Sequence, residues 1–454
     1  MTFQGNTHSV TASNTGTWST KFESAEITRG TYFNGPNNLV SVKSTDLAGN
    51  IATTSHTLNV DTEVTNFART STSTGIDNVL NNAEALQGLT VTGTVEANAT
   101  SVKVMFGNNG PYNADISGTT WSVKVPANVI PQGENKVQLT AVATDQYGNV
   151  SAPHTEMIDV DRIVTPFTRS GGMIGGDGML NASEIAGGLD LNGTGEVGAR
   201  IVVSLQNGAS QEVVVGDNGL WSTQFEASQL PRSSGESMSV TFNATDKAGN
   251  VHPGFTETVL VDTIAPDGAN ITNFIKNAAG TNLTGVILDE NVTSDFSFYR
   301  VGTSGSISKL ALSNSLGSPF AQFNDAVPDG EFLVINHGDT AGNGAATLYL
   351  SSDTNSVSST TIDLNNAAFK NFDFTSLDLS SAKTAMTISA EDLIAITGPD
   401  KTLMIKGGAD DTISLRNAAL AADQSSAEAG YKLYTLGDNA ASLYIDEDII
   451  TTSI

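Results

Sequence analysis

Aspartates recur in this sequence at a regular spacing, within a short motif that gathers oxygen ligands. The motif Asp-x-x-Gly-Asn occurs four times, at Asp46–Asn50, Asp145–Asn149, Asp246–Asn250 and Asp339–Asn343. A Val-Asp pair follows each of the first three copies and ends at Asp61, Asp161 and Asp262. Clustered carboxylates in loops suit Ca2+, because this ion takes about six to eight oxygen ligands at flexible sites.

A second set of acids lies in the loop that opens each following copy. Asp77 and Glu84 form one such pair, and Asp177 and Glu184 form the equivalent pair about 100 residues later. In a linear array of stacked domains, we expect acids from the end of one copy and from the opening loop of the next to meet at one junction. The candidate Ca2+ ligands are therefore Asp46, Asp61, Asp77, Glu84, Asp145, Asp161, Asp177, Glu184, Asp246 and Asp262.

The Asp-x-x-Gly-Asn motif also has a purely structural interpretation, which the sequence leaves open. The Asp side chain can bond to the backbone two residues on, and the Gly can adopt a positive φ, which together make an ordinary turn. That interpretation does not account for the acids at the boundary and in the opening loop. Clustered carboxylates would also repel one another without a cation.

The composition excludes several classes of protein. The chain carries 48 acidic and 21 basic residues, a formal net charge of -27, and a sequence pI of about 4.3. Nucleic acids and anionic membranes are therefore poor partners, because both select a positive surface. The absence of cysteine excludes disulfides, zinc ribbons, iron–sulfur clusters and thiol nucleophiles. The hydrophobic fraction of 39% is sufficient for folded cores.

Targeting and membrane segments are not evident in the sequence. No apolar run approaches the roughly 20 residues that a membrane-spanning helix needs, so we expect no membrane insertion. The first residues lack the basic and apolar regions of a signal peptide. Export by a route that reads a C-terminal signal would reconcile this start with a composition suited to an extracellular protein.

Tryptophan shares the period of the aspartates. Trp18, Trp121 and Trp221 each precede a serine and stand about 100 residues apart, which indicates tandem repeats. Residues 263–352 keep the Asp motif but lack tryptophan, and residues 353–454 lack all the markers. The predicted segments are 1–62, a partial repeat (repeat 1); 63–162 (repeat 2); 163–262 (repeat 3); 263–352, a diverged immunoglobulin-like domain; and 353–454, a separate C-terminal unit.

Each repeat consists of short stretches in which apolar and polar residues alternate, separated by Gly, Asn and Pro. About seven short strands per 100 residues is typical of an immunoglobulin-like sandwich. Trp121 alternates with Val123 and Val125, so we expect all three to point into the core. The expected fold class is all-β, with tandem immunoglobulin-like β-sandwiches in a linear array and a mostly-β C-terminal unit that contains one short helix.

The first sandwich is shorter than the others. Trp121 lies about 57 residues after Val64, whereas only 17 residues precede Trp18. About 40 residues, or the first two or three strands, are thus expected to be missing from repeat 1. Either the chain is a fragment of a longer array, or another chain completes the sandwich by donor-strand addition.

The repeat markers resemble those of the bacterial immunoglobulin-like repeats found in giant adhesins that type I secretion exports. The resemblance rests on Gly-x-Trp-Ser around Trp18 and Trp221, on the one-residue-longer form at Gly118–Ser122, on Asp-x-x-Gly-Asn, and on the boundary sequence Val261–Pro266. It covers residues 1–262 well and 263–352 weakly. The resemblance implies Ca2+ at the junctions between repeats, where it would make the rod rigid.

Residues 353–454 resemble the C-terminal unit of the same secreted proteins. Ser389 followed by acids predicts a helix over 389–396, and hairpins are expected over 402–415 and over 431–449, with a turn at 437–439. The acidic, then apolar and hydroxylated end at 446–454 resembles an uncleaved secretion signal. Related proteins often carry arrays of a Gly-rich nonapeptide. A single degenerate copy at 407–413 cannot form a β-roll, so we expect Asp410 and Asp411 to be hairpin-turn residues, with a calcium role as the alternative.

We expect no enzymatic activity. The histidines His8, His56, His154, His252 and His337 form no metal-binding pair, and no nucleophile elbow, phosphate-binding loop or dinucleotide fingerprint is found. A glycosidase would need two acids that converge in a cleft, which the sequence leaves open.

The resemblance implies an extracellular, calcium-stiffened repeat protein of a bacterial surface adhesin that acts in cell adhesion or biofilm formation. Its partner would be a cell-surface or matrix ligand, either a glycan or a protein, with self-association as a further option. The alternative is a self-assembling surface-layer or filament subunit that completes its partial first sandwich by donor-strand exchange.

Overall fold

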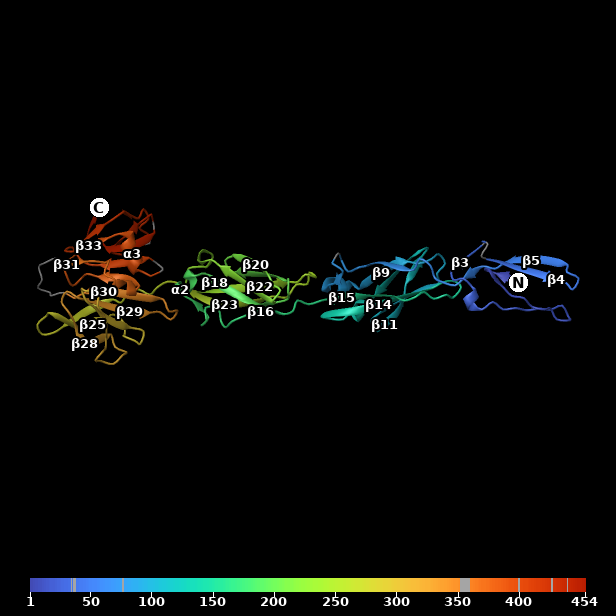
Figure 1. The fold of residues 1–454 in the computed structure, drawn as a ribbon. Helices are drawn as coiled ribbons and strands as arrows, with labels where there is room; N and C mark the ends of the chain where they lie inside the picture. The colour runs from blue at the N-terminus through green and yellow to red at the C-terminus, as the bar shows by residue number, and fades with distance from the viewer. Residues whose placement is uncertain are drawn as a thin grey trace.

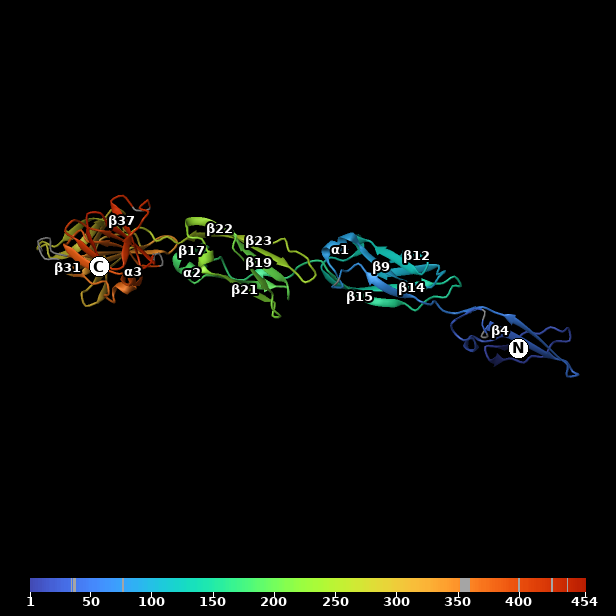
Figure 2. The same cartoon turned by 90° about the horizontal axis from the view of Figure 1, so that it is seen from above.

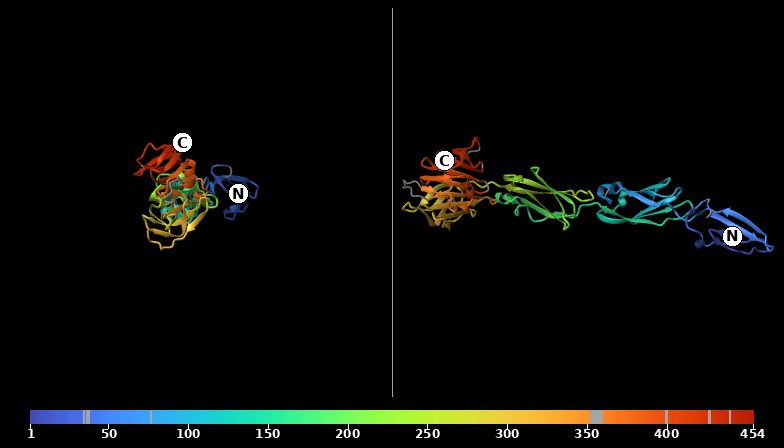
Figure 3. Two further views of the ribbon diagram at one scale, coloured as in Figure 1. Left: turned by 90° about the vertical axis from the view of Figure 1, so that its left-hand side faces the viewer. Right: turned by 45° about the horizontal axis from the view of Figure 1, so that its top comes forward.

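The computed structural model describes residues 1–33, 35, 38–75, 77–351, 360–398, 401–425, 428–438 and 440–454. The chain forms an elongated rod, in which an N-terminal sheet and two sandwiches lie end to end and lead to a wider C-terminal body (Figure 1). Figure 2 shows the same order from above, and Figure 3 shows the rod along and across its length. With 49% of residues in strands and 7% in helices, the expected all-β fold class is confirmed.

Repeat 1 has the smallest core. Its strands are β1 (Thr2–Phe3), β2 (Asn6–Thr7), β3 (Thr31–Tyr32), β4 (Leu39–Thr45), β5 (Ile51–Thr57) and β6 (Val60–Asp61). They form one sheet in the order β2-β1-β4-β5 and a separate β3-β6 pair. The fully buried cluster consists of Phe3, Val40 and Val60 alone among the described residues. Trp18 is 46% exposed, whereas Trp121 and Trp221 are each 2% exposed.

Repeats 2 and 3 are two-sheet sandwiches whose element order is the same except for one additional strand in repeat 2 (β12, Asp115–Ser117). Repeat 2 contains β7 (Ala68–Thr72), β8 (Val79–Leu80), α1 (Asn82–Gln87), β9 (Leu89–Thr94), β10 (Ser101–Phe106), β11 (Asn109–Asn113), β12 (Asp115–Ser117), β13 (Thr120–Val125), β14 (Glu134–Thr144) and β15 (His154–Asp161). Repeat 3 contains β16 (Phe167–Arg169), β17 (Met179–Leu180), α2 (Ala182–Ala186), β18 (Leu189–Gly195), β19 (Arg200–Leu205), β20 (Ser210–Val214), β21 (Leu220–Phe225), β22 (Ser234–Thr245) and β23 (Phe255–Asp262).

The tryptophan of each sandwich fills the space between its sheets. Trp121, Val123 and Val125 are all buried, as the alternation predicted. The indole N–H of Trp121 donates to the carbonyl of Thr94 at 3.1 Å, and the ring lies so close to Gly93 that a Cβ there would collide with it. Because a larger residue would displace the ring, the strand opposite the tryptophan needs glycine at this position.

The loop that opens each sandwich contains a short helix that the sequence analysis did not predict. Asn81 caps α1, and its side chain accepts a hydrogen bond from the backbone N–H of Glu84 while Glu84 accepts one from Asn81. Asn181 and Glu184 repeat this capping box at α2. Asn followed three residues later by Glu is a recognised helix-start signal, but the helices are too short to show helical periodicity.

The C-terminal body consists of a sandwich half and a parallel half. The first half contains β24 (Ile271–Lys276), β25 (Asn282–Leu288), β26 (Ser297–Val301), β27 (Ile307–Leu310), β28 (Phe320–Pro328), β29 (Phe332–Gly338) and β30 (Gly344–Leu350). The second half contains β31 (Thr360–Ile362), β32 (Phe374–Asp378), β33 (Thr384–Ile388), α3 (Ala390–Ile396), β34 (Thr402–Lys406), β35 (Thr412–Leu415), β36 (Ala418–Leu420), β37 (Tyr431–Leu436), β38 (Ala441–Asp446) and β39 (Ile450–Ser453).

One nine-stranded sheet joins these halves, in the order β27-β26-β29-β30-β32-β34-β38-β37-β36. Its central strands are buried on both faces. Leu333 and Ile335 lie in the core of the sandwich, whereas Phe332 and Val334 pack in a second core with Phe374. The boundary at 352/353 stays a prediction, since it falls on residues outside the described ranges, but strands on both sides of it belong to one sheet.

The parallel half differs from the sequence expectation for residues 402–415. β34 pairs in parallel with β32 and β38, while β35 pairs in parallel with β33 and β39 of a second sheet. The predicted hairpin is therefore wrong, and so is the expectation that no roll could form. The turn at 407–411 connects the two sheets of a parallel roll, and the parallel series begins at β30.

Hydrogen bonds explain how one glycine-rich turn suffices in this roll. The Asp411 side chain is 1% exposed and accepts backbone N–H groups of Thr384 at 2.8 Å and Gly408 at 2.9 Å. It thus fastens its own turn to the preceding one, whereas the alternative calcium role of Asp410 and Asp411 stays a prediction. The predicted helix at Ser389 and the hairpin of β37 and β38 are confirmed. Within the predicted turn at 437–439, Asn439 lies outside the described residues.

Candidate metal centre

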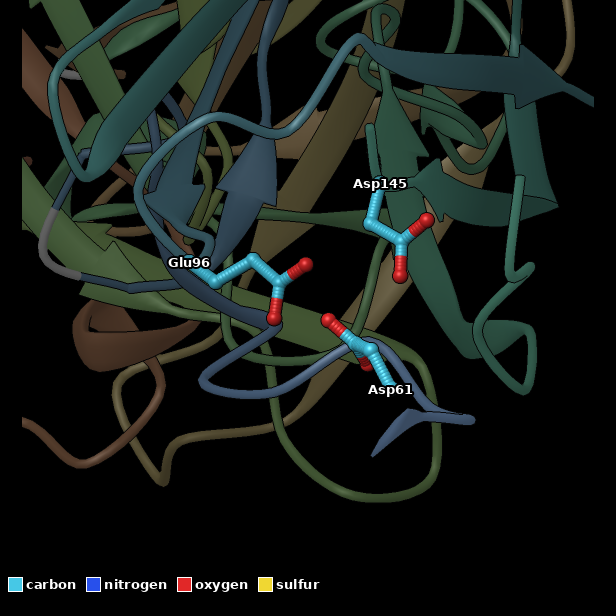
Figure 4. Close-up of side chains that lie close together, drawn as sticks. All are labelled: Asp61, Glu96 and Asp145. Atoms are coloured by element: carbon cyan, nitrogen blue, oxygen red, sulfur yellow. The ribbon is translucent and has the colours of Figure 1, made fainter. Parts of the chain in front are cut away.

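Three carboxylates from two successive repeats converge where repeat 1 meets repeat 2. Asp61 ends β6 of repeat 1, whereas Glu96 follows β9 and Asp145 follows β14 of repeat 2. One oxygen of each side chain lies within 4.8 Å of the others. Figure 4 shows the three side chains converging on a common space. We call this group the first carboxylate trio, and its location the first joint.

An equivalent group lies at the second joint, between repeats 2 and 3. Asp161 ends β15, Glu196 follows β18, and Asp246 follows β22, with the same limit of 4.8 Å between ligand oxygens. In both trios the member from the Asp-x-x-Gly-Asn motif is buried and the other two are half-buried. The arrangement therefore repeats with the period of the sequence.

The Asp-x-x-Gly-Asn turn holds its first aspartate in place. The Asp145 side chain accepts hydrogen bonds from the backbone N–H groups of Tyr147 and Asn149, each at 2.8 Å, and from the Asn149 amide. Burial alone would raise the pKa of Asp145, but the bonds from Asn149, Tyr147 and Gly148 hold this pKa below its ordinary value. Asp145 is thus kept ionised, as a cation ligand must be.

Repulsion is evident at the second trio. Burial, together with the charge of Asp246, raises the pKa of Asp161. Burial, together with the charges of Asp161, Asp246 and Glu134, raises the pKa of Glu196 to about 7. The guanidinium of nearby Arg162 does not neutralise the group, because its hydrogen bonds go to the Asn82 side chain and to backbone carbonyls. Without a cation, part of the second trio is protonated near neutral pH.

The predicted residues are only partly brought together. Asp61 meets Asp145, and Asp161 meets Asp246. The junction argument did not expect these pairs, because it joined the end of one copy to the opening loop of the next. Asp46 lies in an exposed turn at the far tip of repeat 1, where its side chain accepts the backbone N–H groups of Ala48 and Asn50. The ligand role of every predicted residue stays a prediction.

The opening-loop acids lie at the other end of their own repeat. β8 pairs with Asp159 and Val160 at the very end of β15, so the opening loop lies at the end of repeat 2 that faces repeat 3. There Asp77 accepts the N–H of Val79, and Glu84 accepts the N–H of Asn81. Asp177 and Glu184 make the same two bonds in repeat 3. These four acids shape the turn and the helix start, and they do not belong to either trio.

Glu96 and Glu196 were missed by the sequence analysis. Both follow a Gly-Thr pair by two residues and stand 100 residues apart, at Gly93–Glu96 and Gly193–Glu196. This spacing was a usable signal, because it equals the period of the other markers. It was obscured because both glutamates lie in a loop between two strands, far in sequence from the boundary motifs.

The third joint, between repeat 3 and the C-terminal body, differs. The Asn343 side-chain amide donates to the carbonyl of Asp262 at 3.0 Å, but the described residues contain no trio here. Instead, an open cavity of about 1090 Å³ lies beside the joint, and its lining includes Arg232, Glu290 and His337. Burial lowers the pKa of His337 despite the acids near it. Charges of both signs thus replace the purely acidic group.

The trios have the chemistry of a calcium site. All the donors are oxygens, and three carboxylates supply up to six of them. In each trio two acids follow a strand and the third is the last residue of one. No histidine belongs to either group, so a transition metal that prefers nitrogen would gain little. An ion at either trio would bind two repeats at once.

Comparison with solved structures returned bacterial adhesins among the similar folds. A Ca2+-stabilized adhesin that helps an Antarctic bacterium reach out and bind ice is 22% identical, with a TM-score of 0.35, and the match covers 77% of this chain and 88% of the other. A 1.5-MDa bacterial ice-binding adhesin studied for its host cell surface retention is 21% identical, with a TM-score of 0.37 and coverage of 61% and 93%.

A bacterial immunoglobulin-like domain from the M. primoryensis ice-binding adhesin matches 21% of this chain and 96% of its own length, at 25% identity and a TM-score of 0.17. No family model matches the chain, and no curated protein matches its sequence. None of the described helices is long and apolar enough to cross a membrane.

Proposed function

We propose that this chain is an extracellular, non-catalytic segment of a bacterial surface adhesin, in which Ca2+ bound at the joints stiffens the rod. The observation that carries the proposal is the composition of the trios, since each draws one carboxylate from one repeat and two from the next. An ion there would link neighbouring repeats and would offset the burial and the charge repulsion that together raise the pKa of Glu196. Stiffening would hold a distal binding region away from the cell surface.

The proposal also includes the secretion route, the extracellular medium and the ligand. The acidic and then apolar segment at 446–454 would serve as a C-terminal signal for type I secretion, and it contains β39 of the roll. The net charge of -27 suits an extracellular medium rich in divalent cations. The adhesin would act in cell adhesion or biofilm formation through a glycan or protein ligand on a cell or in a matrix.

The test is calorimetric titration of the whole chain with Ca2+. Two matched variants change the first aspartate of the Asp-x-x-Gly-Asn motif, each in a different repeat. Asp145→Asn alters the first trio, whereas Asp46→Asn alters the equivalent turn outside any trio. We expect two Ca2+ ions per wild-type chain, two for Asp46→Asn and one for Asp145→Asn. Glu96→Gln combined with Glu196→Gln should abolish binding at both joints. Binding that persists in this double variant would refute the proposed sites.

Thermal unfolding provides a second readout. At a Ca2+ concentration of about 100 times Kd, binding stabilises the folded form by about 2.7 kcal/mol. For domains of this size, about 1 kcal/mol shifts Tm by roughly 4–8 °C, so the repeats should melt at least 10 °C higher than in EDTA. An unchanged melting curve would contradict calcium stiffening.

A second candidate function rests on repeat 1. Its three-residue buried cluster and the exposure of Trp18 leave apolar surface that an added strand could cover. Donor-strand exchange between copies would then build a filament or a surface layer. Light scattering after size-exclusion chromatography decides between the two functions, because a strictly monomeric chain at high concentration rules out assembly.

A further inference from the structure

Beyond the carboxylate trios, successive units are joined by a set of neutral hydrogen bonds that recurs at two joints. At the second joint, the Asn250 amide donates to the carbonyl of Asp161 at 2.9 Å, and its oxygen accepts the backbone N–H of Asn82 at 2.7 Å. The Asn81 side chain donates to the carbonyl of Ala248 at 3.0 Å. The Asp-x-x-Gly-Asn turn of repeat 3 thus bonds both to the end of the last strand of repeat 2 and to the start of helix α1 of repeat 2.

The third joint repeats these bonds one for one. Asn343 donates to the carbonyl of Asp262 at 3.0 Å and accepts the backbone N–H of Ala182 at 2.8 Å. The Asn181 side chain donates to the carbonyl of Ala341 at 3.1 Å. This agreement is informative because the unit beyond the third joint has diverged from the repeats and its described residues form no trio, yet the contact is kept.

Each helix start supplies the groups that this contact needs. The first N–H groups of any helix have no partner within the helix, so those of Asn82 and Ala182 are available to an outside acceptor. The cap residues Asn81 and Asn181 use their side-chain oxygen to cap the helix and their side-chain N–H to reach the next unit. Asparagine carries its acceptor oxygen and its N–H donors on separate atoms, so it can cap its own helix and donate to the next unit at the same time.

The motif's own residues complete the contact. Gly342 has a φ of +87°, and a side chain there would meet the Asn181 amide at 3.5 Å. Asn343 and Asn250 are 5% and 6% exposed, whereas Asn50 of the undocked turn in repeat 1 is exposed. The internal bonds to Asp46 are the same as those in the docked turns. The turn is therefore formed with or without a neighbour, and docking adds the burial.

We propose that the Asp-x-x-Gly-Asn turn and the N-capped helix start of the preceding unit form an ion-independent latch that fixes the orientation of successive units. Three bonds at separate points restrict both bending and rotation about the rod axis. The three recurring bonds join uncharged amides and carbonyls, so the latch responds little to salt, pH or chelators. At the second joint the Asn250 amide also donates to a carboxylate oxygen of Asp161 at 3.3 Å. The trios would then add stiffness to joints whose geometry the latch already defines, and the latch stands whether or not Ca2+ binds.

The test uses the third joint, where no trio contributes. Because the chain has no cysteine, Ser222→Cys in β21 and Ser308→Cys in β27 can carry two spin labels, one on each side of the joint. Pulsed electron paramagnetic resonance in EDTA then measures the spread of the distance between the labels. Ala182→Pro removes the backbone N–H that donates to Asn343. Proline is tolerated at this first position of a helix, and the preceding residue, Asn181, already has the extended backbone that proline requires.

The latch predicts a narrow distance distribution for the labelled parent and loss of that narrow peak in Ala182→Pro. Ala182→Ser keeps the N–H and should match the parent. Asn181→Asp keeps a strong cap but loses the donor to Ala341, and should broaden the distribution as well. Circular dichroism checks that both variants are folded. A distribution in Ala182→Pro and Asn181→Asp as narrow as that of the parent would overturn the latch. This outcome is separate from the Ca2+ titration, which depends on the first and second joints.

Discussion

The second and third joints share one set of hydrogen bonds and differ in charge. Asn250 and Asn343 make equivalent contacts with the preceding unit. Only the second joint adds a carboxylate trio, in which Glu196 has a pKa of about 7. The difference teaches that docking does not require a carboxylate trio, because the third joint keeps the hydrogen bonds although its described residues contain no trio. Dependence on a cation should therefore be local to particular joints rather than general to the rod.

The units beyond these joints differ as well. Repeat 3 packs around one core, whereas the C-terminal body shares β29 and β30 between two cores. A continuous sheet thus joins the sandwich half to the parallel half. Where a sheet provides the connection, an ion at the interface would add little.

The largest expected effect comes from the shared sheet. Phe374→Ala removes a fully buried ring from the second core, which should cost about 3–5 kcal/mol. Because β30 and β32 are adjacent, the sandwich half and the parallel half should lose stability together, while repeats 2 and 3 do not. Hydrogen-exchange mass spectrometry measures this for each segment. Loss confined to residues 360–454 would show that the two halves are independent.

A smaller effect distinguishes a docked turn from a free one. Gly342 and Gly49 both have a φ of +87°, so alanine at either costs about 1–2 kcal/mol in backbone strain. Only Gly342 lies in a docked turn, next to Asn343, which bonds to Asp262 and to Ala182 of the preceding unit. Strain in this turn would displace Asn343 from those partners. Gly342→Ala should therefore destabilise its own unit and also weaken the third joint, whereas Gly49→Ala should affect repeat 1 alone. Equal label distributions across the third joint in the two variants would contradict the docking role of the turn.

The repeat architecture was predictable because its signals are local. Alternation around Trp121 and the period of about 100 residues are properties of the sequence itself, and antiparallel sandwiches place such residues in a core. The sequence at Asn81 contains a capping box, but the helix that follows is too short to be recognised by the spacing of its apolar residues.

Contacts that depend on long-range pairing were not predictable. The parallel pairing of β8 with β15 decides which end of repeat 2 carries Asp77, and nothing near Asp77 indicates it. Likewise, the sequence of the turn at 407–411 does not distinguish an antiparallel hairpin from a parallel roll. Glu96 joins Asp61 and Asp145 only because three separate loops end at one joint.

The smallest expected effect is a pH dependence at the second joint in the absence of cations. The pKa of Glu196 is raised from 4.5 to about 7 in the folded chain, so the folded state binds this proton more tightly than the unfolded state. The resulting stability is fully present below about pH 4.5 and is lost as pH rises to about 7. In EDTA, wild type should therefore gain stability relative to Glu196→Gln when pH falls from 8 to 5. If the difference in the free energy of unfolding between wild type and Glu196→Gln stayed constant from pH 8 to 5, it would contradict the raised pKa.

The most direct test of the account compares the two joints within one experiment. Spin labels at Gln138→Cys and Ser222→Cys span the second joint, and labels at Ser222→Cys and Ser308→Cys span the third. We expect added Ca2+ to narrow the distance distribution across the second joint and to leave that across the third unchanged. An equal response at both joints, or no response at the second, would contradict the claim that the carboxylate trios confer a local dependence on calcium.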